Sequence, residues 1–128
     1  MKSPFFPMDT DRILYRADGV IGFYDAFPVS PGHALVIAEE VTVSIFDLSE
    51  DRQAALWRAV DEVRDLQNQR HGPDGFTIGV NDGTAAGQTV SHAHIHVIPR
   101  YRNDVPDPRG GIRWVIPSKA VYWRDDRV

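Results

Sequence analysis

Three of the five histidines in this 128-residue chain lie at positions 92, 94 and 96, each separated from the next by one apolar residue. Because successive side chains of an extended strand point to opposite faces, His92, His94 and His96 are predicted to line one face of a strand. A neutral imidazole is a nucleophile and titrates near pH 7. Three such rings in a row suit an active site far better than a hydrophobic core.

A row of imidazoles can bind a metal ion, lie on the surface without a role, or catalyse a reaction. Zinc needs ligands that converge on one point, whereas the first and third histidines of a strand start ~13 Å apart. A further ligand would have to come from His33 or a distant carboxylate. The segment ends in Ile98-Pro99 and its other face is apolar, which disfavours a surface strand without a role. Both alternatives stay open, but the pattern favours catalysis.

The residues around the histidines point to chemistry at phosphorus. An imidazole nitrogen can attack phosphorus and form a phosphoramidate, which divides one displacement into two easier steps. The attacking ring must be held in one tautomer, and the non-bridging oxygens need hydrogen-bond donors. Gly87 lets the backbone approach closely, and Gln88, Thr89 and Asn81 supply amide and hydroxyl donors.

Length and composition exclude several classes of protein. A chain of 128 residues with 42% hydrophobic residues fits a single domain, residues 1–128, with a small core. A net charge of −4 argues against nucleic acid or a membrane surface as a partner. The chain has no cysteine, which excludes disulfides and thiolate chemistry. No apolar run approaches the ~20 residues of a membrane span, and the start does not resemble a signal peptide, so a cytoplasmic protein is expected.

The elements that must position these residues can be read from hydrophobic spacing and turn signals. One helix is predicted over residues 50–70, with Ser49 as its N-cap and Gly72-Pro73 at its end. Strands are predicted at 12–16 and 20–25 around an Asp-Gly turn, at 34–37, at 76–80 and at the histidines. Loops are expected at 27–32 and 99–111, and residues 121–123 are expected to form a short strand or a partner contact.

Three segments carry a family resemblance. Residues 87–100, GQTVSHAHIHVIPR, closely resemble the signature of the histidine triad superfamily, His-x-His-x-His followed by apolar residues. Residues 30–37, SPGHALVI, and 81–83, NDG, resemble the Pro-Gly-His-x-Leu-Val-Ile segment and the Asn-x-Gly turn of the same family. The resemblance covers about residues 12–101 and leaves 102–128 as a C-terminal extension. Its Pro99-Arg100-Tyr101 ending looks more like the branch that hydrolyses dinucleoside polyphosphates.

The resemblance implies both a fold and a reaction. The fold is α+β, an antiparallel sheet with one main helix, and is usually a homodimer. The reaction is hydrolysis or transfer at the α-phosphate of a purine nucleotide, such as a diadenosine polyphosphate. The resemblance implies no cofactor and no metal bound by the catalytic histidines, although a divalent cation can accompany the substrate phosphates.

Residue roles follow from the same resemblance. His94 matches the nucleophile that forms a nucleotidyl-histidine intermediate, and His96 matches the histidine that contacts phosphate and assists the leaving group. His92 matches the residue that orients His94, and His33 matches the one that buttresses the array. The matched substrate positions are Asn81, Gln88 and Thr89 for phosphate, Asp25 for ribose, and Phe23, joined by Ile13, for the base.

The sequence departs from the family pattern after Ile37. Many relatives continue with basic residues, whereas this chain has Glu39 and Glu40, which would weaken attraction for a polyphosphate if they faced the cleft. The alternatives are a nucleoside 5′-phosphoramidate hydrolase, a nucleotide-binding module with incidental activity, and a metal-dependent enzyme or metal carrier. A homodimer is expected, and its interface is predicted to use Trp114, Tyr122 and Trp123.

Overall fold

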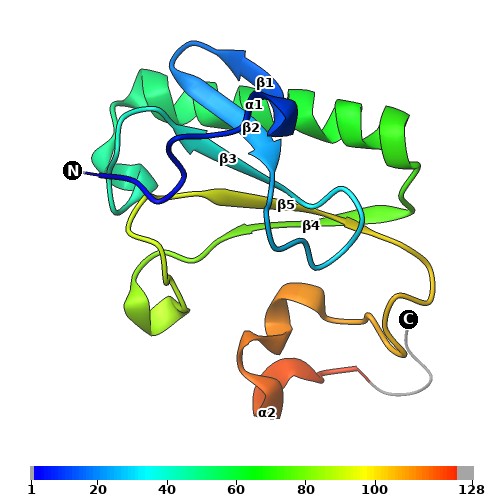
Figure 1. Cartoon of the computed structure of the whole chain (residues 1–128). Coiled ribbons are helices and arrows are strands. Elements are labelled where there is room, and N and C mark those ends of the chain that lie inside the picture. The colour runs from blue at the N-terminus through cyan, green and yellow to red at the C-terminus, as the bar shows by residue number, and fades with distance from the viewer. Residues whose placement is uncertain (1, 124–128) are drawn as a thin grey trace.

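One antiparallel sheet with a single long helix on one face forms the body of the molecule (Figure 1). The computed structural model describes residues 2–123. The five strands follow the order β1-β2-β3-β5-β4 across the sheet. Their bounds are β1 Ile13–Ala17, β2 Val20–Tyr24, β3 Ala34–Ala38, β4 Gly75–Val80 and β5 Ile95–Arg100. The α+β fold predicted from the sequence is confirmed.

Helix α1, Glu50–His71, begins and ends where the sequence predicts. The Ser49 hydroxyl accepts a hydrogen bond from the Arg52 N–H at 3.1 Å, which satisfies one of the free N–H groups of the first turn. Gly72 ends the helix in the left-handed conformation, at φ +59°, which glycine adopts without a Cβ clash. The buried stripe that includes Leu56 and Val63 packs on the sheet, and the charged residues face outward.

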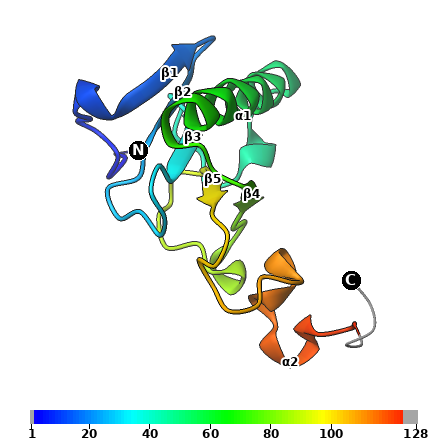
Figure 2. The ribbon, with the colours of Figure 1, turned by 90° about the vertical axis from the view of Figure 1, so that its right-hand side faces the viewer.

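The two faces of the sheet have different covers. Ala34, Val36 and Ala38 of β3 belong to the core beneath α1, together with Ile95 and Val97 of β5. Leu35 and Ile37 point to the opposite face, where they join Phe23 and residues of the N-terminal segment. Turning the molecule shows α1 and this segment, residues 2–12, on opposite sides of the sheet (Figure 2). His96 of β5 pairs with Leu35, and directly paired residues share a face, so the His96 side chain also lies on the face opposite α1.

A predicted hairpin begins the sheet. Asp18 and Gly19 both have positive φ, +54° and +75°, as a two-residue type I′ turn requires, and they join β1 to β2. The turn pairs β1 with β2, and β2 pairs in turn with β3, where Tyr24 lies opposite Ala34, the residue after His33.

The C-terminal extension lies beyond the β4 edge of the sheet in both views (Figures 1 and 2). It contains the short helix η4, Gly111–Val115, and one further turn, α2, Pro117–Ala120. Residues 121–123 form no strand in the described part of the chain, so that alternative of the prediction is wrong. The Arg113 guanidinium instead lies over the Tyr122 ring, 4.6 Å from its centroid. Within residues 2–123 we find no helix long and apolar enough to cross a membrane.

Candidate active site

The Nδ1 atom of His94 is held by a hydrogen bond to the backbone, and the ring lines a cavity. Its Nδ1 lies 2.8 Å from the carbonyl oxygen of His92, which can only accept, so Nδ1 carries the hydrogen. The neutral ring therefore keeps its lone pair on Nε2. Because His94 lines the cavity described below, this nitrogen has the position and the tautomer of a nucleophile.

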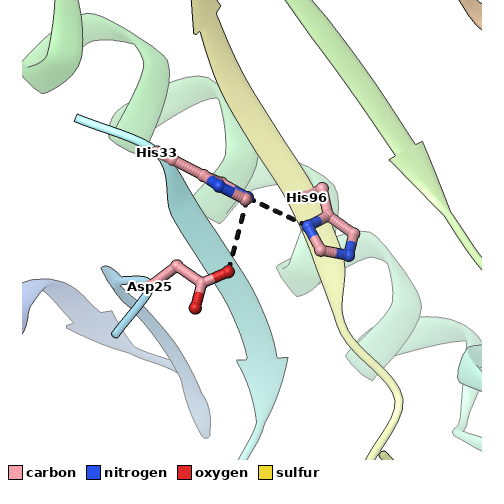
Figure 3. Close-up of side chains that lie close together, drawn as sticks. All are labelled: Asp25, His33 and His96. Carbon is pink, nitrogen blue, oxygen red and sulfur yellow. Dashed lines mark hydrogen bonds and ion pairs between the residues drawn. The ribbon is translucent and has the colours of Figure 1, made fainter. Parts of the chain in front are cut away.

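His33 fixes the tautomer of His96 (Figure 3). The backbone N–H of Val29 donates to Nδ1 of His33 at 3.1 Å, so the hydrogen of the neutral His33 ring is on Nε2. This Nε2–H donates to Nδ1 of His96 at 3.0 Å. His96 must then carry its own hydrogen on Nε2, the nitrogen that points away from His33 in Figure 3. His96 is thereby a hydrogen-bond donor.

His92 is a buried support for the array. Only 1% of its surface is exposed. Its Nε2 donates to the carbonyl oxygen of Ala38 at 2.7 Å, so its Nδ1 accepts from the Ser3 hydroxyl at 2.5 Å. Because both of its ring nitrogens form hydrogen bonds, His92 is fixed in position. Its backbone carbonyl, which accepts the hydrogen bond from His94, is fixed with it. Ser3 has no counterpart in the sequence prediction, because a lone serine near the start carries no pattern.

Burial keeps the supporting histidines neutral. It is the main cause that lowers the pKa of His33, His92 and His96 below the ordinary value of 6.5. The pKa of His96 falls to about 4, with the neighbouring His94 and His33 as further causes. These three rings are consequently uncharged at pH 7, and the tautomers deduced above are those of neutral imidazoles.

The predicted single strand of histidines is corrected in one respect. Strand β5 begins at Ile95, so only His96 belongs to it. The two residues before β5 form other hydrogen bonds in place of the sheet ladder. The Ala93 N–H donates to the carbonyl oxygen of Thr42, and Nδ1 of His94 donates to the carbonyl oxygen of His92. The rings still lie in a row, with centroids of His94 and His96 5.0 Å apart and those of His96 and His33 5.2 Å apart.

A cavity of about 410 Å³ opens in front of His94 and His96. Its volume is within the ~300–1,000 Å³ typical of small-molecule sites. Polar groups from several loops reach it, and apolar side chains close one end. The lining includes Asp25, Asn81, Gln88 and Thr89 among the polar residues and Phe5, Phe27, Leu35 and Val90 among the apolar ones.

The predicted phosphate-contacting residues divide into two kinds. The Gln88 amide is buried and fully used, because its oxygen accepts from the Gly83 N–H at 2.8 Å and its nitrogen donates to two carbonyl oxygens, of Val43 and Val90. Gln88 therefore holds the loop that borders the cavity. Asn81 and Thr89 are exposed, and within residues 2–123 their side chains have no hydrogen-bond partner.

Asp25, the residue predicted to bind ribose, lines the cavity and also starts a turn. One carboxylate oxygen accepts from the Phe27 N–H at 3.0 Å, while the other lies 3.6 Å from Nε2 of His33. The carboxylate thus faces His33 from the side opposite the Val29 N–H, and its free lone pairs remain available to hydroxyl groups.

Phe5 occupies the position that the sequence suggested for Phe23. Phe23 is completely buried, and the Phe5 ring lies against it in an edge-on arrangement with 5.4 Å between centroids. Phe5 also lies 5.5 Å from the His94 ring centre. Ile13 packs into the same cluster beneath. Of Phe5 and Phe23, only Phe5 lines the cavity, and no periodic pattern marks it in the sequence.

Few charged side chains line the cavity. Arg12 is the only arginine or lysine among the described residues that line it, and its guanidinium donates to the carbonyl oxygen of Tyr24 at 3.0 and 3.1 Å. Glu39 and Glu40 are exposed and do not line it, and Glu39 pairs with Arg16 on the surface. The two acids therefore do not oppose an anionic ligand within the cavity.

The residues that could together bind a metal ion differ from the three histidines of the predicted strand. Asp25, His33 and His96 have potential ligand atoms within 4.8 Å of one another. A metal ion on Nε2 of His33 would have to displace the hydrogen that this nitrogen donates to His96, because Nδ1 already accepts from Val29. His92 likewise has both nitrogens engaged, so it offers no free ligand atom. The donor set fits a hydrogen-bonded array better than a metal centre.

Comparison with known proteins agrees with this geometry. The profile described as "HIT domain" matches residues 8–103. An uncharacterized HIT-like protein of Saccharolobus solfataricus is 36% identical over 99 residues, which cover 77% of this chain and 70% of that protein. A bis(5'-adenosyl)-triphosphatase of Dictyostelium discoideum is 38% identical over 93 residues, covering 73% of this chain and 62% of that enzyme. The crystal structure of NitFhit from Caenorhabditis elegans superimposes with a TM-score of 0.75 at 34% identity, covering 84% of this chain and 26% of that one.

The fold and the array of imidazoles thus define a histidine triad domain. The chain belongs to the HIT family. It spans less than two thirds of the Dictyostelium enzyme.

Proposed function

We propose that this chain is a nucleotide hydrolase or transferase that cleaves a purine dinucleotide, such as a diadenosine polyphosphate, at the α-phosphate. The reaction passes through a nucleotidyl-histidine intermediate on His94. The observation that carries the proposal is the hydrogen bond from Nδ1 of His94 to the His92 carbonyl, which leaves Nε2 unprotonated at the cavity. The name of the Dictyostelium relative, a bis(5'-adenosyl)-triphosphatase, supports the same substrate class.

In the first step, Nε2 of His94 attacks the α-phosphorus and the bond from phosphorus to the bridging oxygen breaks. The imidazole gains positive charge as the N–P bond forms, and its Nδ1–H bond to the His92 carbonyl stabilises that charge. The Nε2–H of His96 donates to the oxygen that departs with the second nucleotide. In the second step water attacks the same phosphorus and loses a proton to solvent. The N–P bond breaks with its electron pair returning to Nε2, so His94 leaves as neutral imidazole and a nucleoside monophosphate is released.

The remaining side chains bind the substrate. Asn81 and Thr89 donate to the non-bridging oxygens, since neither has a partner within residues 2–123. The Asp25 carboxylate accepts from a ribose hydroxyl, and Phe5 covers the base. Gln88 acts indirectly, by holding the loop. A divalent cation that arrives with the phosphates supplements Arg12 in balancing their charge.

The experiment is a brief reaction with diadenosine triphosphate, quenched in alkali and analysed by mass spectrometry. We expect one added adenylyl group on the wild-type protein and none on the His94→Ala variant. Hydrolysis of a nucleoside 5′-phosphoramidate alone would instead identify the phosphoramidase alternative. Tight nucleotide binding without an adduct from either substrate would reject the covalent mechanism and favour the binding module.

We also propose that the chain forms a homodimer. The sheet ends in β1 on one side and β4 on the other, and each has one unpaired edge within the described sheet. The exposed aromatic residues Trp57 and Trp114 offer further contact surface. Light scattering coupled to size-exclusion chromatography measures the mass directly, and a mass of one chain would reject this part of the proposal.

A further inference from the structure

A second cavity lies beside the first, on the far side of His96. Its volume is about 480 Å³, and its apolar walls include Ile98 of β5 and Ile112 and Val115 of η4. Both cavities are lined by Asn81 and His96. A molecule bound in the first cavity can therefore continue past these two residues into the second.

Strand β4 contributes a glycine to the lining of the second cavity. Gly79 pairs with His96 in the β4–β5 ladder and lines the cavity without a side chain. A Cβ at this position would lie 3.5 Å from the Cδ1 atom of Ile112, in ordinary contact across the cavity. The backbone of β4 at Gly79 and the side chain of Ile112 in η4 thus approach each other closely at this point of the lining.

The described lining of the second cavity offers no cationic side chain to balance the charge of phosphates. None of the described residues that line the second cavity is lysine or arginine. Arg100, on the same strand as His96, is paired with Asp104 through two hydrogen bonds of 2.7 and 2.9 Å. An apolar cavity with few polar groups favours an uncharged aromatic ring over an anion.

We propose that this cavity binds the second nucleoside of a dinucleoside polyphosphate, the part that departs when the α-phosphate is attacked. The inference rests on the proposed function. His96 lies at the boundary between the cavities, where the bridging oxygen would leave, and its Nε2–H is the donor at that point. Asn81 lies at the same boundary and reaches the phosphates between the two nucleosides. The C-terminal extension then determines the preference for the leaving group.

The test compares two substrates that differ in the leaving group. Diadenosine triphosphate carries a second nucleoside, whereas adenosine 5′-phosphoramidate releases only ammonia. The Ile112→Asp variant places a carboxylate on the η4 wall of the cavity, facing β4. We expect kcat/KM for diadenosine triphosphate to fall about tenfold or more relative to kcat/KM for the phosphoramidate. The Gly79→Val variant, which fills the opposite wall, should change the ratio in the same direction.

Val121→Asp is the matched control, because Val121 is exposed on the same extension and does not line the cavity. An unchanged ratio in both cavity variants would overturn the inference, as would an equal fall for both substrates. A wild-type protein that forms no adduct with either substrate would overturn the proposed function itself. Adduct formation by the wild-type protein is therefore measured before any variant. A failure of the proposed function is thus distinguished from a failure of the inference about the second cavity.

Discussion

Nε2 of His33 donates a hydrogen bond across 3.0 Å to Nδ1 of His96, and this contact joins the start of β3 to β5. The contact determines which nitrogen of His96 faces the substrate. His33 is itself oriented by the Val29 N–H and faced by the Asp25 carboxylate. Gln67 of α1, completely buried, secures the same region by donating to the carbonyl oxygens of Gly32 and Val97 at 2.9 Å.

Replacing His33 by alanine should reduce kcat about 10–100-fold, because His96 loses the bond that fixes its tautomer. The same change should raise the pKa of His96, since His33 is among the causes that lower it. Histidine ring signals in NMR titrations measure that pKa separately from activity. A kcat loss without any change in the titration of His96 would contradict the positioning role.

Replacing His94 by glycine should reduce kcat by about 10⁴-fold or more, because the nucleophile itself is removed. Added imidazole should restore part of the activity by entering the space left by the ring. The measurement is the rate of diadenosine triphosphate hydrolysis with and without imidazole. A His94→Gly protein that keeps more than about a tenth of the wild-type rate would exclude a covalent role for this residue.

The Ser3→Ala variant should lower the free energy of unfolding by about 1–3 kcal/mol, because Nδ1 of the buried His92 loses its hydrogen-bond donor. Urea denaturation measures this change. Ser3→Thr keeps the hydroxyl and serves as the matched control. Equal stability of the alanine variant and the wild type would show that the Ser3 bond contributes nothing.

Gln88 and Thr89 are adjacent, yet their substitutions should have different effects. Gln88→Leu removes three internal hydrogen bonds and should destabilise the fold by about 1–3 kcal/mol. Thr89→Val alters an exposed side chain and should leave stability within about 0.5 kcal/mol of the wild type. The Thr89→Val variant should lower kcat/KM about tenfold, because the hydroxyl that donates to the phosphate is lost. Thermal unfolding and steady-state kinetics on both variants separate the two roles.

Stability should decline as the pH falls below 6.5. The folded-state pKa values of His33, His92 and His96 lie below the value of 6.5 expected in the unfolded chain. Between the two values the unfolded chain binds more protons, so the free energy of unfolding rises with pH. For His96 this window runs from about 4 to 6.5. Urea denaturation at pH 5 and pH 8 measures the difference, and His96→Gln should reduce it.

Much of the fold can be predicted from local sequence patterns. The sequence predicts a helix at 50–70, and the structure has α1 at Glu50–His71. The agreement is close because the 3.6-residue apolar period and the serine N-cap both depend on residues near one another in the chain. The Asp18-Gly19 turn is equally local. The three histidines were recognised together with the phosphate donors because their spacing is short. The extension at 111–120 has no such period, and its two short helices were not predicted.

Residue types at short spacing are enough to predict the family, the plan of the sheet and helix, and the imidazoles available for catalysis. Contacts made in the folded chain determine which nitrogen of His33, His92 and His96 carries hydrogen. Those tautomers depend on Ser3, Val29 and Ala38, which lie far from residues 92–96 along the chain. The tertiary structure also decided that Phe5 covers Phe23 and that η4 closes a second cavity, since both contacts join the body of the sheet to segments without periodic pattern.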